Sequence, residues 1–171
     1  MNLRNYIDEI PDFPRSGILF RDFCPLLRDP EAWTYAIKQF ESFCDQLKPD
    51  LIAGIEARGF IIGSSLATSQ KLGFLPIRKG GKLAGDTIGI DYELEYGRDR
   101  LEIQKNIIVP NTKVLIVDDL LATGGTAKTS SQLVVEAGGN VAGYCFIIEL
   151  VDLMGRTRLD KNIPIKSLLT Y

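Results

Sequence analysis

The run of residues 114–126, VLIVDDLLATGGT, constrains the fold more than any other part of the chain. It begins with four apolar residues, three of them β-branched, which is typical of a strand buried on both faces of a parallel sheet. Asp118 and Asp119 follow, and a turn of small residues leads into a helix predicted over 125–137. Ligands of open α/β sheets bind at the carboxyl ends of the strands, so this run predicts a ligand site.

The pattern elsewhere predicts alternating helices and strands. Asp29 can cap a helix over 30–47, because Pro30 suits a first helical turn. Further helices are predicted over 58–71 and, as a short one, 152–159, and strands over 51–55, 74–77, 113–117 and 141–150. Strand, helix and strand in succession form βαβ units, so we expect one α/β domain over 1–171, with a twisted, mainly parallel sheet flanked by helices.

Composition excludes several classes of site and partner. The 171 residues include no histidine, which removes Ser-His-Asp and Cys-His catalysis and the usual zinc sites. Three cysteines, none in a CxxC pair, argue against a disulfide framework and for a reducing, cytoplasmic location. A net charge of −2 gives no indication of nucleic-acid binding. We expect no secretory signal, and the apolar run 141–151 is too short to span a membrane.

The turn at 122–126, ATGGT, has the features of an anion site. Gly124 and Gly125 permit close backbone approach, and Ala122, Thr123 and Thr126 complete a loop of N–H and hydroxyl donors. A phosphate here would leave the two acids to reach sugar hydroxyls or a magnesium-bound ligand, which is the layout of a ribose 5-phosphate. The run matches neither a Walker A loop nor GxGxxG. The alternative is an ordinary strand–turn–helix with a capping threonine and solvated acids.

This run resembles the phosphoribosyl diphosphate signature of type I phosphoribosyltransferases. Other segments are similar to blocks of the adenine phosphoribosyltransferase family, in that family's order, over residues 11 to 151. They are Phe13-Pro14, Gly17–Asp22 (GILFRD), Glu56–Phe60 (EARGF), Arg78-Lys79 with Gly81–Leu83, and Leu94–Gly97 (LEYG).

The resemblance implies a type I phosphoribosyltransferase fold with an N-terminal hood over 1–29 and a mobile catalytic loop over 79–100. It implies a purine-salvage enzyme that converts adenine and phosphoribosyl diphosphate to AMP and pyrophosphate. The cofactor would be Mg²⁺, held mainly by substrate and water with no direct protein ligand. A homodimer is expected, in which a residue of the Arg78 type can act across the interface.

The same resemblance assigns cations to the leaving diphosphate. Arg58, Arg78, Lys79 and Lys82 are the candidates, because negative charge builds on pyrophosphate as it departs. The alternative for the Arg78-Lys79 pair is a solvated face.

Purine chemistry is assigned to two other segments. Glu95 would exchange a proton at N7, and Tyr96 would help to close the loop and exclude water. The alternative is a plain edge strand. Leu19 and Arg21 would read adenine through backbone groups and Phe20 through its ring; alternatively, Phe20 fills the core and Arg21 pairs with Asp22 at the surface.

Two positions depart from the family pattern, and two rival functions stay open. Cys24 replaces a small hydroxyl residue and is interpreted as a buried structural cysteine, and Ala84 replaces a common proline. The first rival is transfer to a 6-oxo purine or another base. The second is a phosphoribosyl-diphosphate-sensing regulator of nucleic acid, which would need a basic face that this sequence does not indicate.

Overall fold

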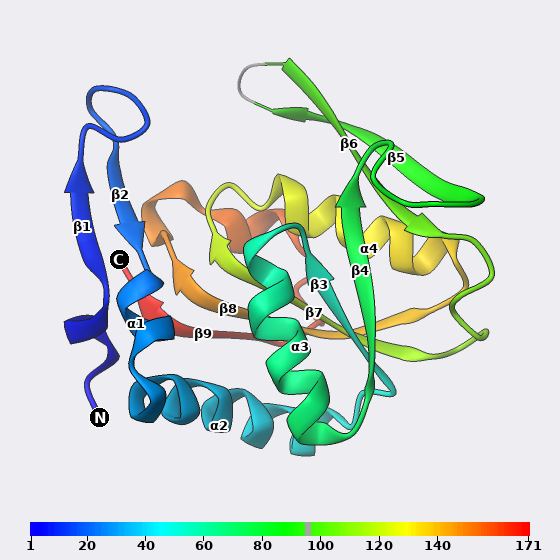
Figure 1. Cartoon of the computed structure of the whole chain (residues 1–171). Helices are drawn as coiled ribbons and strands as arrows, with labels where there is room; N and C mark the ends of the chain where they lie inside the picture. Colours follow the sequence, from blue (N-terminus) through cyan, green and yellow to red (C-terminus); the bar gives the residue numbers. More distant parts are fainter. Residues whose placement is uncertain (95–96) are drawn as a thin grey trace.

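The computed structural model describes residues 1–94 and 97–171, with side chains described for 1–92 and 99–171. A seven-stranded sheet of order β5-β6-β4-β3-β7-β8-β9 forms the centre, and β1 and β2 form a separate hairpin (Figure 1). The strands are β1 (Asp8–Pro11), β2 (Leu19–Asp22), β3 (Leu51–Ile55), β4 (Gly73–Lys79), β5 (Thr87–Leu94), β6 (Gly97–Gln104), β7 (Lys113–Leu121), β8 (Asn140–Glu149) and β9 (Ile165–Thr170). The α-helices are α1 (Cys24–Arg28), α2 (Pro30–Leu47), α3 (Arg58–Gln70) and α4 (Gly125–Glu136), and the 3₁₀ turns are η1 (Leu3–Tyr6), η2 (Val151–Leu153) and η3 (Gly155–Arg158).

The five strands β4, β3, β7, β8 and β9 run parallel, and β6 and β5 extend the sheet antiparallel. The α/β prediction is therefore confirmed. Alternate residues of β7 enter opposite cores, since Leu115 and Val117 pack with α2 and α3, whereas Val114 and Ile116 pack with α4. All four are fully buried, which explains the unbroken apolar run.

The chain reverses direction across the sheet between β3 and β7. The crossover containing α3 leads from β3 to β4, and that containing α4 leads from β7 to β8 on the other side of this point. A topological switch point of this kind opens a crevice at the carboxyl ends of the strands. β7 is longer than the predicted 113–117, because its pairing with β8 continues to Leu121 whereas its pairing with β3 stops at Val117.

Three segments differ from the sequence predictions. The short helix expected over 152–159 is wrong: two 3₁₀ turns, η2 and η3, occupy it, separated by Met154 in the left-handed conformation. Strand β9 and the hairpin β1–β2 have no counterpart among the predicted elements. The hairpin of β5 and β6, which starts at Thr87 and ends at Gln104, forms the edge of the sheet and packs over α4 (Figure 1). No helix in the described part of the chain is long and apolar enough to cross a membrane.

Candidate active site

The predicted phosphate loop joins the end of β7 to the start of α4. Its residues, with Arg58, line a cavity of about 190 Å³; they are Asp118, Asp119, Leu120, Leu121, Ala122, Thr123, Gly124, Gly125, Thr126 and Ala127. Gly124 precedes the helix with φ +82°, and no side chain caps the helix there. The first N–H groups of α4 therefore lack a partner within the helix and are available to an anion, whose charge the helix dipole favours.

The two acids of the run occupy different environments. Asp119 is 8% exposed and its Oδ2 lies 2.8 Å from Arg58 Nε. Asp118 accepts a 2.9 Å hydrogen bond from the Asp119 backbone N–H. Desolvation, followed by the neighbouring charge of Asp119, raises the pKa of Asp118 well above its usual range. Desolvation thus disfavours the ionised form of Asp118.

Arg58 reaches this site because α3 begins close against β7. A Cβ on Gly59 would lie 2.7 Å from the carbonyl oxygen of Val117 and 3.0 Å from Asp118 Oδ1. Only glycine permits that approach, so Gly59 sets the position of the Arg58 side chain beside Asp119. Sequence reasoning did not single out Gly59, although its place directly after Arg58 in the EARGF block was a signal.

The predicted base-binding segment lies next to the phosphate loop. A second cavity, of about 90 Å³, is lined by hood and loop residues: Ile18, Leu19, Phe20, Arg21, Arg58, Asp119, Leu120 and Leu150. Arg58 and Asp119 line both cavities, so the two are adjacent. Phe20 is half-buried on β2, packed edge-on against Phe13 with ring centroids 5.2 Å apart, and the Arg58 guanidinium lies 5.6 Å from its ring centre.

The alternatives for this hood segment do not match the structure. Phe20 does not belong to either buried core cluster. The ion pair of Arg21 is with Glu9 at 3.8 Å, and its guanidinium stacks 4.0 Å from the ring centre of Tyr171. The alternative in which Arg21 pairs with Asp22 at the surface is therefore wrong. Asp22 instead accepts a hydrogen bond from the backbone N–H of Cys24.

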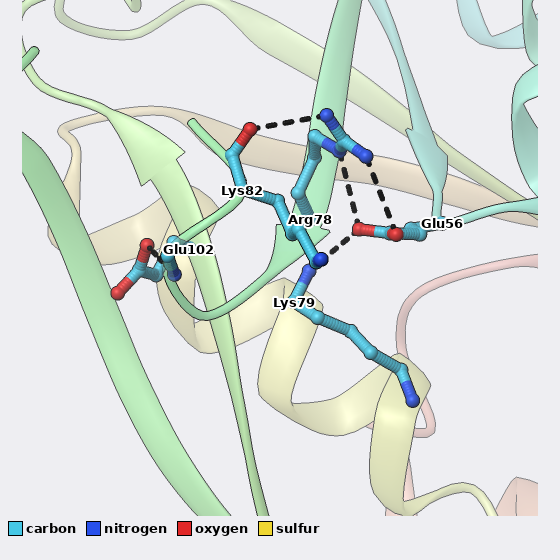
Figure 2. Close-up of polar contacts among 6 residues, drawn as sticks. Glu56, Arg78, Lys79, Lys82 and Glu102 are labelled. Atoms are coloured by element: carbon cyan, nitrogen blue, oxygen red, sulfur yellow. Dashed lines mark hydrogen bonds and ion pairs between the residues drawn. The ribbon is translucent and has the colours of Figure 1, made fainter. Parts of the chain in front are cut away.

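Arg78, Lys79 and Lys82 gather around a carboxylate that sequence reasoning missed. Glu56 accepts hydrogen bonds from Arg78 Nε at 3.2 Å, Arg78 Nη2 at 3.4 Å and the Lys79 backbone N–H at 2.8 Å (Figure 2). Arg78 Nη1 also donates to the Lys82 carbonyl oxygen at 3.0 Å. Burial opposes ionisation of Glu56, but the bonds from Lys79 and Arg78 prevail and lower its pKa.

A second carboxylate holds the same loop from β6. Glu102 accepts a hydrogen bond from the Gly81 backbone N–H at 3.0 Å (Figure 2). It also accepts one from Arg100 Nε at 2.9 Å. The structure thus brings Arg78, Lys79 and Lys82 together near Glu56, which lies two residues before Arg58 in sequence. Unlike Arg58, none of the three lines the phosphate-loop cavity. The position of Glu56 within EARGF was the only signal for this clamp.

The hairpin β5–β6 meets the phosphate loop through Tyr92. Burial raises the pKa of the Tyr92 hydroxyl, and a side-chain hydrogen bond with Thr126 partly offsets the rise. Sequence reasoning missed this contact. Glu95 and Tyr96, the residues predicted to act at the purine, lie outside the described residues, and their roles stay predictions.

Cys24 corrects one expectation. The sequence interpretation was a buried structural cysteine, but Cys24 is exposed at the start of α1, whereas Cys44 and Cys145 are buried. Its thiol interacts with Asp22, and that hydrogen bond raises the thiol pKa. A raised pKa disfavours the reactive thiolate form of Cys24.

Comparison with known proteins identifies the family. The model of the phosphoribosyl transferase domain matches residues 31–169. The chain is 56% identical to adenine phosphoribosyltransferase of Prochlorococcus marinus (strain MIT 9313), over 100% of this chain and 99% of that protein. The crystal structure of adenine phosphoribosyltransferase from Thermoanaerobacter pseudethanolicus superposes with a TM-score of 0.95 at 47% identity, covering 99% of this chain and 98% of that one.

A further relative was solved as a complex with ligands. Adenine phosphoribosyltransferase from Saccharomyces cerevisiae, complexed with an imino-altritol bisphosphate and adenine, is 42% identical over 98% of this chain and 96% of that chain, with a TM-score of 0.93. Near-complete coverage of both chains at these identities leaves no part of the fold unaccounted for. The chain is a member of the adenine phosphoribosyltransferase family, with the type I phosphoribosyltransferase fold.

Proposed function

We infer that this protein transfers the 5-phosphoribosyl group from phosphoribosyl diphosphate to adenine, giving AMP and pyrophosphate in purine salvage. The observation that carries the inference is the adjacency of two cavities that share Arg58 and Asp119. One presents the unpaired N–H groups of α4 and the other presents the hood. A sugar phosphate in the first and a purine in the second would meet at the anomeric carbon.

Binding of the sugar is assigned to the end of β7. The N–H groups and hydroxyls of 122–126 would hold the 5-phosphate, while Asp118 and Asp119 face the ribose hydroxyls. Bond breaking at the anomeric carbon runs ahead of bond making, so the sugar becomes oxocarbenium-like and charge builds on the departing diphosphate. Fixed donors aimed at that charge lower the barrier because they need no reorganisation during reaction.

The leaving diphosphate is assigned to Arg58, Arg78, Lys79 and Lys82. Arg58 is 46% exposed while paired with Asp119, so its remaining donors are free to reach a ligand. Glu56 holds the Arg78 side chain and the Lys79 backbone, and Asp99 pairs with the Lys79 ammonium at 3.2 Å, so the geometry of both cations is set before a ligand arrives. Such pre-organisation reduces the conformational entropy that these side chains lose when a ligand binds.

The donor chemistry fits magnesium that is held through the substrate. Among the residues whose side chains are described, no group of three or more acidic or sulfur ligands gathers that would hold a metal alone. Magnesium usually retains water and binds through few protein carboxylates plus substrate phosphates, so Asp118 and Asp119 would reach a magnesium-bound ligand rather than the ion itself. When bound, magnesium neutralises diphosphate charge.

Selection of adenine is assigned to the hood. Backbone N–H and C=O groups of Leu19 and Arg21 would pair with N1 and the 6-amino group, with Phe20 against the ring. A 6-oxo purine reverses that donor–acceptor pattern and would leave buried groups unpaired, which discriminates strongly. Glu95 would take the N7 proton, and Tyr96 would close the loop over 79–100.

We also propose a cytoplasmic homodimer that carries Arg78 near its interface. The three free cysteines suit a reducing compartment. Ile61, on the outer face of α3, is 42% exposed beside Phe60, whose ring lies 5.9 Å from the Arg78 guanidinium. Light scattering coupled to size exclusion tests the assembly, and a monomer at micromolar concentration would contradict it.

The decisive assay mixes the protein with phosphoribosyl diphosphate, Mg²⁺ and adenine, hypoxanthine or guanine. We expect AMP from adenine, with kcat/KM for hypoxanthine and guanine lower by a factor on the order of 10⁴. Faster reaction with either 6-oxo purine would overturn the adenine assignment. Omission of Mg²⁺ should abolish turnover.

A further inference from the structure

The phosphate loop rests on the turn η3, which lines neither the phosphate cavity nor the hood cavity. Gly155, the first residue of η3, is buried directly against the loop. A Cβ on Gly155 would overlap the carbonyl oxygen of Ala122, and a Cβ on Gly124 would overlap the carbonyl oxygen of Gly155. The backbone of Gly155 therefore packs directly against the backbone of the phosphate loop, so a shift of Gly155 must displace the loop.

A buried carboxylate anchors the residue that follows Gly155. Glu149, the last residue of β8, is 4% exposed. It accepts hydrogen bonds from Arg156 Nε at 2.5 Å, Arg156 Nη2 at 2.6 Å and Ser167 Oγ at 2.6 Å. This bidentate pairing fixes the orientation of the guanidinium as well as its distance from the carboxylate. Arg156 is thereby tied to β8 and β9 at the level of the site.

The strand end that carries Glu149 is also tied to the strand end that carries the loop. The Leu150 backbone N–H donates to the Leu121 carbonyl oxygen at 2.9 Å, and the Tyr171 N–H donates to the Glu149 carbonyl oxygen at 2.9 Å. Glu149 is therefore held in a fixed place relative to β7. From that fixed point, a direct path to the loop runs through the Arg156 side chain and the Gly155 backbone.

We propose that Glu149 and Arg156 are positioning residues that hold Gly155 behind the phosphate loop and thereby set the loop's affinity for the phosphate end of the sugar substrate. The inference rests on the proposed function of residues 122–126. It predicts that the phosphate affinity depends on a pair of side chains that do not touch the ligand. Because adenine is assigned to a different cavity, adenine binding should not share that dependence.

The test compares Arg156→Met with Arg156→Lys and with the control Lys161→Met. Lys161 is exposed on the segment that follows η3, and its change removes the same charge without altering the contact with Glu149. Calorimetric titration with ribose 5-phosphate should show affinity about 10-fold weaker in Arg156→Met, as expected for small misplacement of binding groups. Arg156→Lys should recover part of the loss and Lys161→Met should match wild type.

Kinetics provide a second readout. In Arg156→Met, KM for phosphoribosyl diphosphate should rise with the ribose 5-phosphate Kd, while KM for adenine stays within about twofold of wild type. A lower Tm with unchanged ribose 5-phosphate affinity would show a merely structural role and overturn the proposal. If Lys161→Met weakened ribose 5-phosphate binding equally, the loss of one positive charge would explain the effect and the proposal would be overturned.

A folding failure and a failure of the proposed function can both be distinguished from a failure of this proposal. If Arg156→Met does not fold because Glu149 is left buried and unpaired, the double variant Glu149→Gln/Arg156→Met removes that charge and carries the same prediction. Wild-type protein that binds ribose 5-phosphate but forms no AMP would contradict the proposed function alone. The affinity comparison among the variants would then still decide the positioning role.

Discussion

Substitution of Gly124 or Gly125 by alanine separates the folding role of the phosphate loop from its binding role. Gly124 has φ +82°, and an added Cβ there would overlap the Gly155 carbonyl oxygen, with the carbonyl carbon at 3.1 Å and Cα at 3.2 Å. Gly125 does not have positive φ, and the nearest atom to its added Cβ is Arg158 Nη1 at 3.8 Å. An alanine at position 124 would therefore be strained and crowded, whereas an alanine at position 125 would have room.

The magnitudes follow from these environments. A left-handed alanine costs about 1–2 kcal/mol and overpacking against backbone about 1–3 kcal/mol, so Gly124→Ala should lose roughly 2–5 kcal/mol, or roughly 4–20 °C in Tm. Gly125→Ala removes a helical glycine and should leave Tm unchanged or raise it by about 1–4 °C. Because Gly125 lines the phosphate cavity, the added methyl group should nevertheless weaken ribose 5-phosphate binding.

Differential scanning fluorimetry gives both Tm values, and calorimetry with ribose 5-phosphate gives the affinities. We expect Gly124→Ala to lose stability and binding together and Gly125→Ala to lose binding alone. A Gly124→Ala protein with wild-type Tm would refute the clash with Gly155. Undiminished binding in Gly125→Ala would refute the assignment of the phosphate to the start of α4.

Three further changes test individual carboxylates. The folded-state pKa of Asp118 is raised, so ionisation of this carboxyl opposes folding above its unfolded pKa of about 3.9. Asp118→Asn should therefore raise Tm at pH 7. The gain in Tm should shrink as pH falls towards 3, where the carboxyl is protonated in both states. The pKa of Glu56 is lowered, so its stabilisation is present at pH 7 and is lost as pH falls through the folded pKa. Glu56→Gln should lower Tm by a few degrees (about 1 kcal/mol, since Arg78 is partly exposed) at pH 7, and a difference undiminished at pH 3 would contradict the clamp. Glu95→Ala should reduce kcat about 100-fold or more with ribose 5-phosphate affinity within about twofold, and unchanged kcat would remove Glu95 from the mechanism.

The elements predicted well are those whose pattern is long or whose ends carry local signals. Helix α2 begins at Pro30 and ends at Leu47 as predicted, because the Asp29 side chain caps it through the N–H groups of Glu31 and Ala32. Strand β7 was evident because both of its faces are buried, which leaves no polar alternation. In each case the determining interactions lie within one element or its first turn.

The elements missed depend on neighbours distant in sequence. Strand β9 is half-buried along most of its length and forms by parallel pairing with β8. The hairpin β1–β2 buries none of its eight residues fully, so it carries little apolar periodicity. The expected helix over 152–159 fails because Met154 takes φ +54° and Gly155 packs against the phosphate loop.

By itself, the sequence determined the α/β class, the strand–turn–helix over 114–126 and the family, because these reside in contiguous runs whose chemistry is local. Residues 114–126 contain strand, acids, turn and helix start in one segment, so no folding is needed to bring them together. Only the tertiary structure decided which acid Arg58 pairs with, that Glu56 holds Arg78, and that Glu149 anchors Arg156. In each of these contacts, the distance in space between the two residues depends on strand order and on close packing at glycines. Neither can be read from composition or spacing.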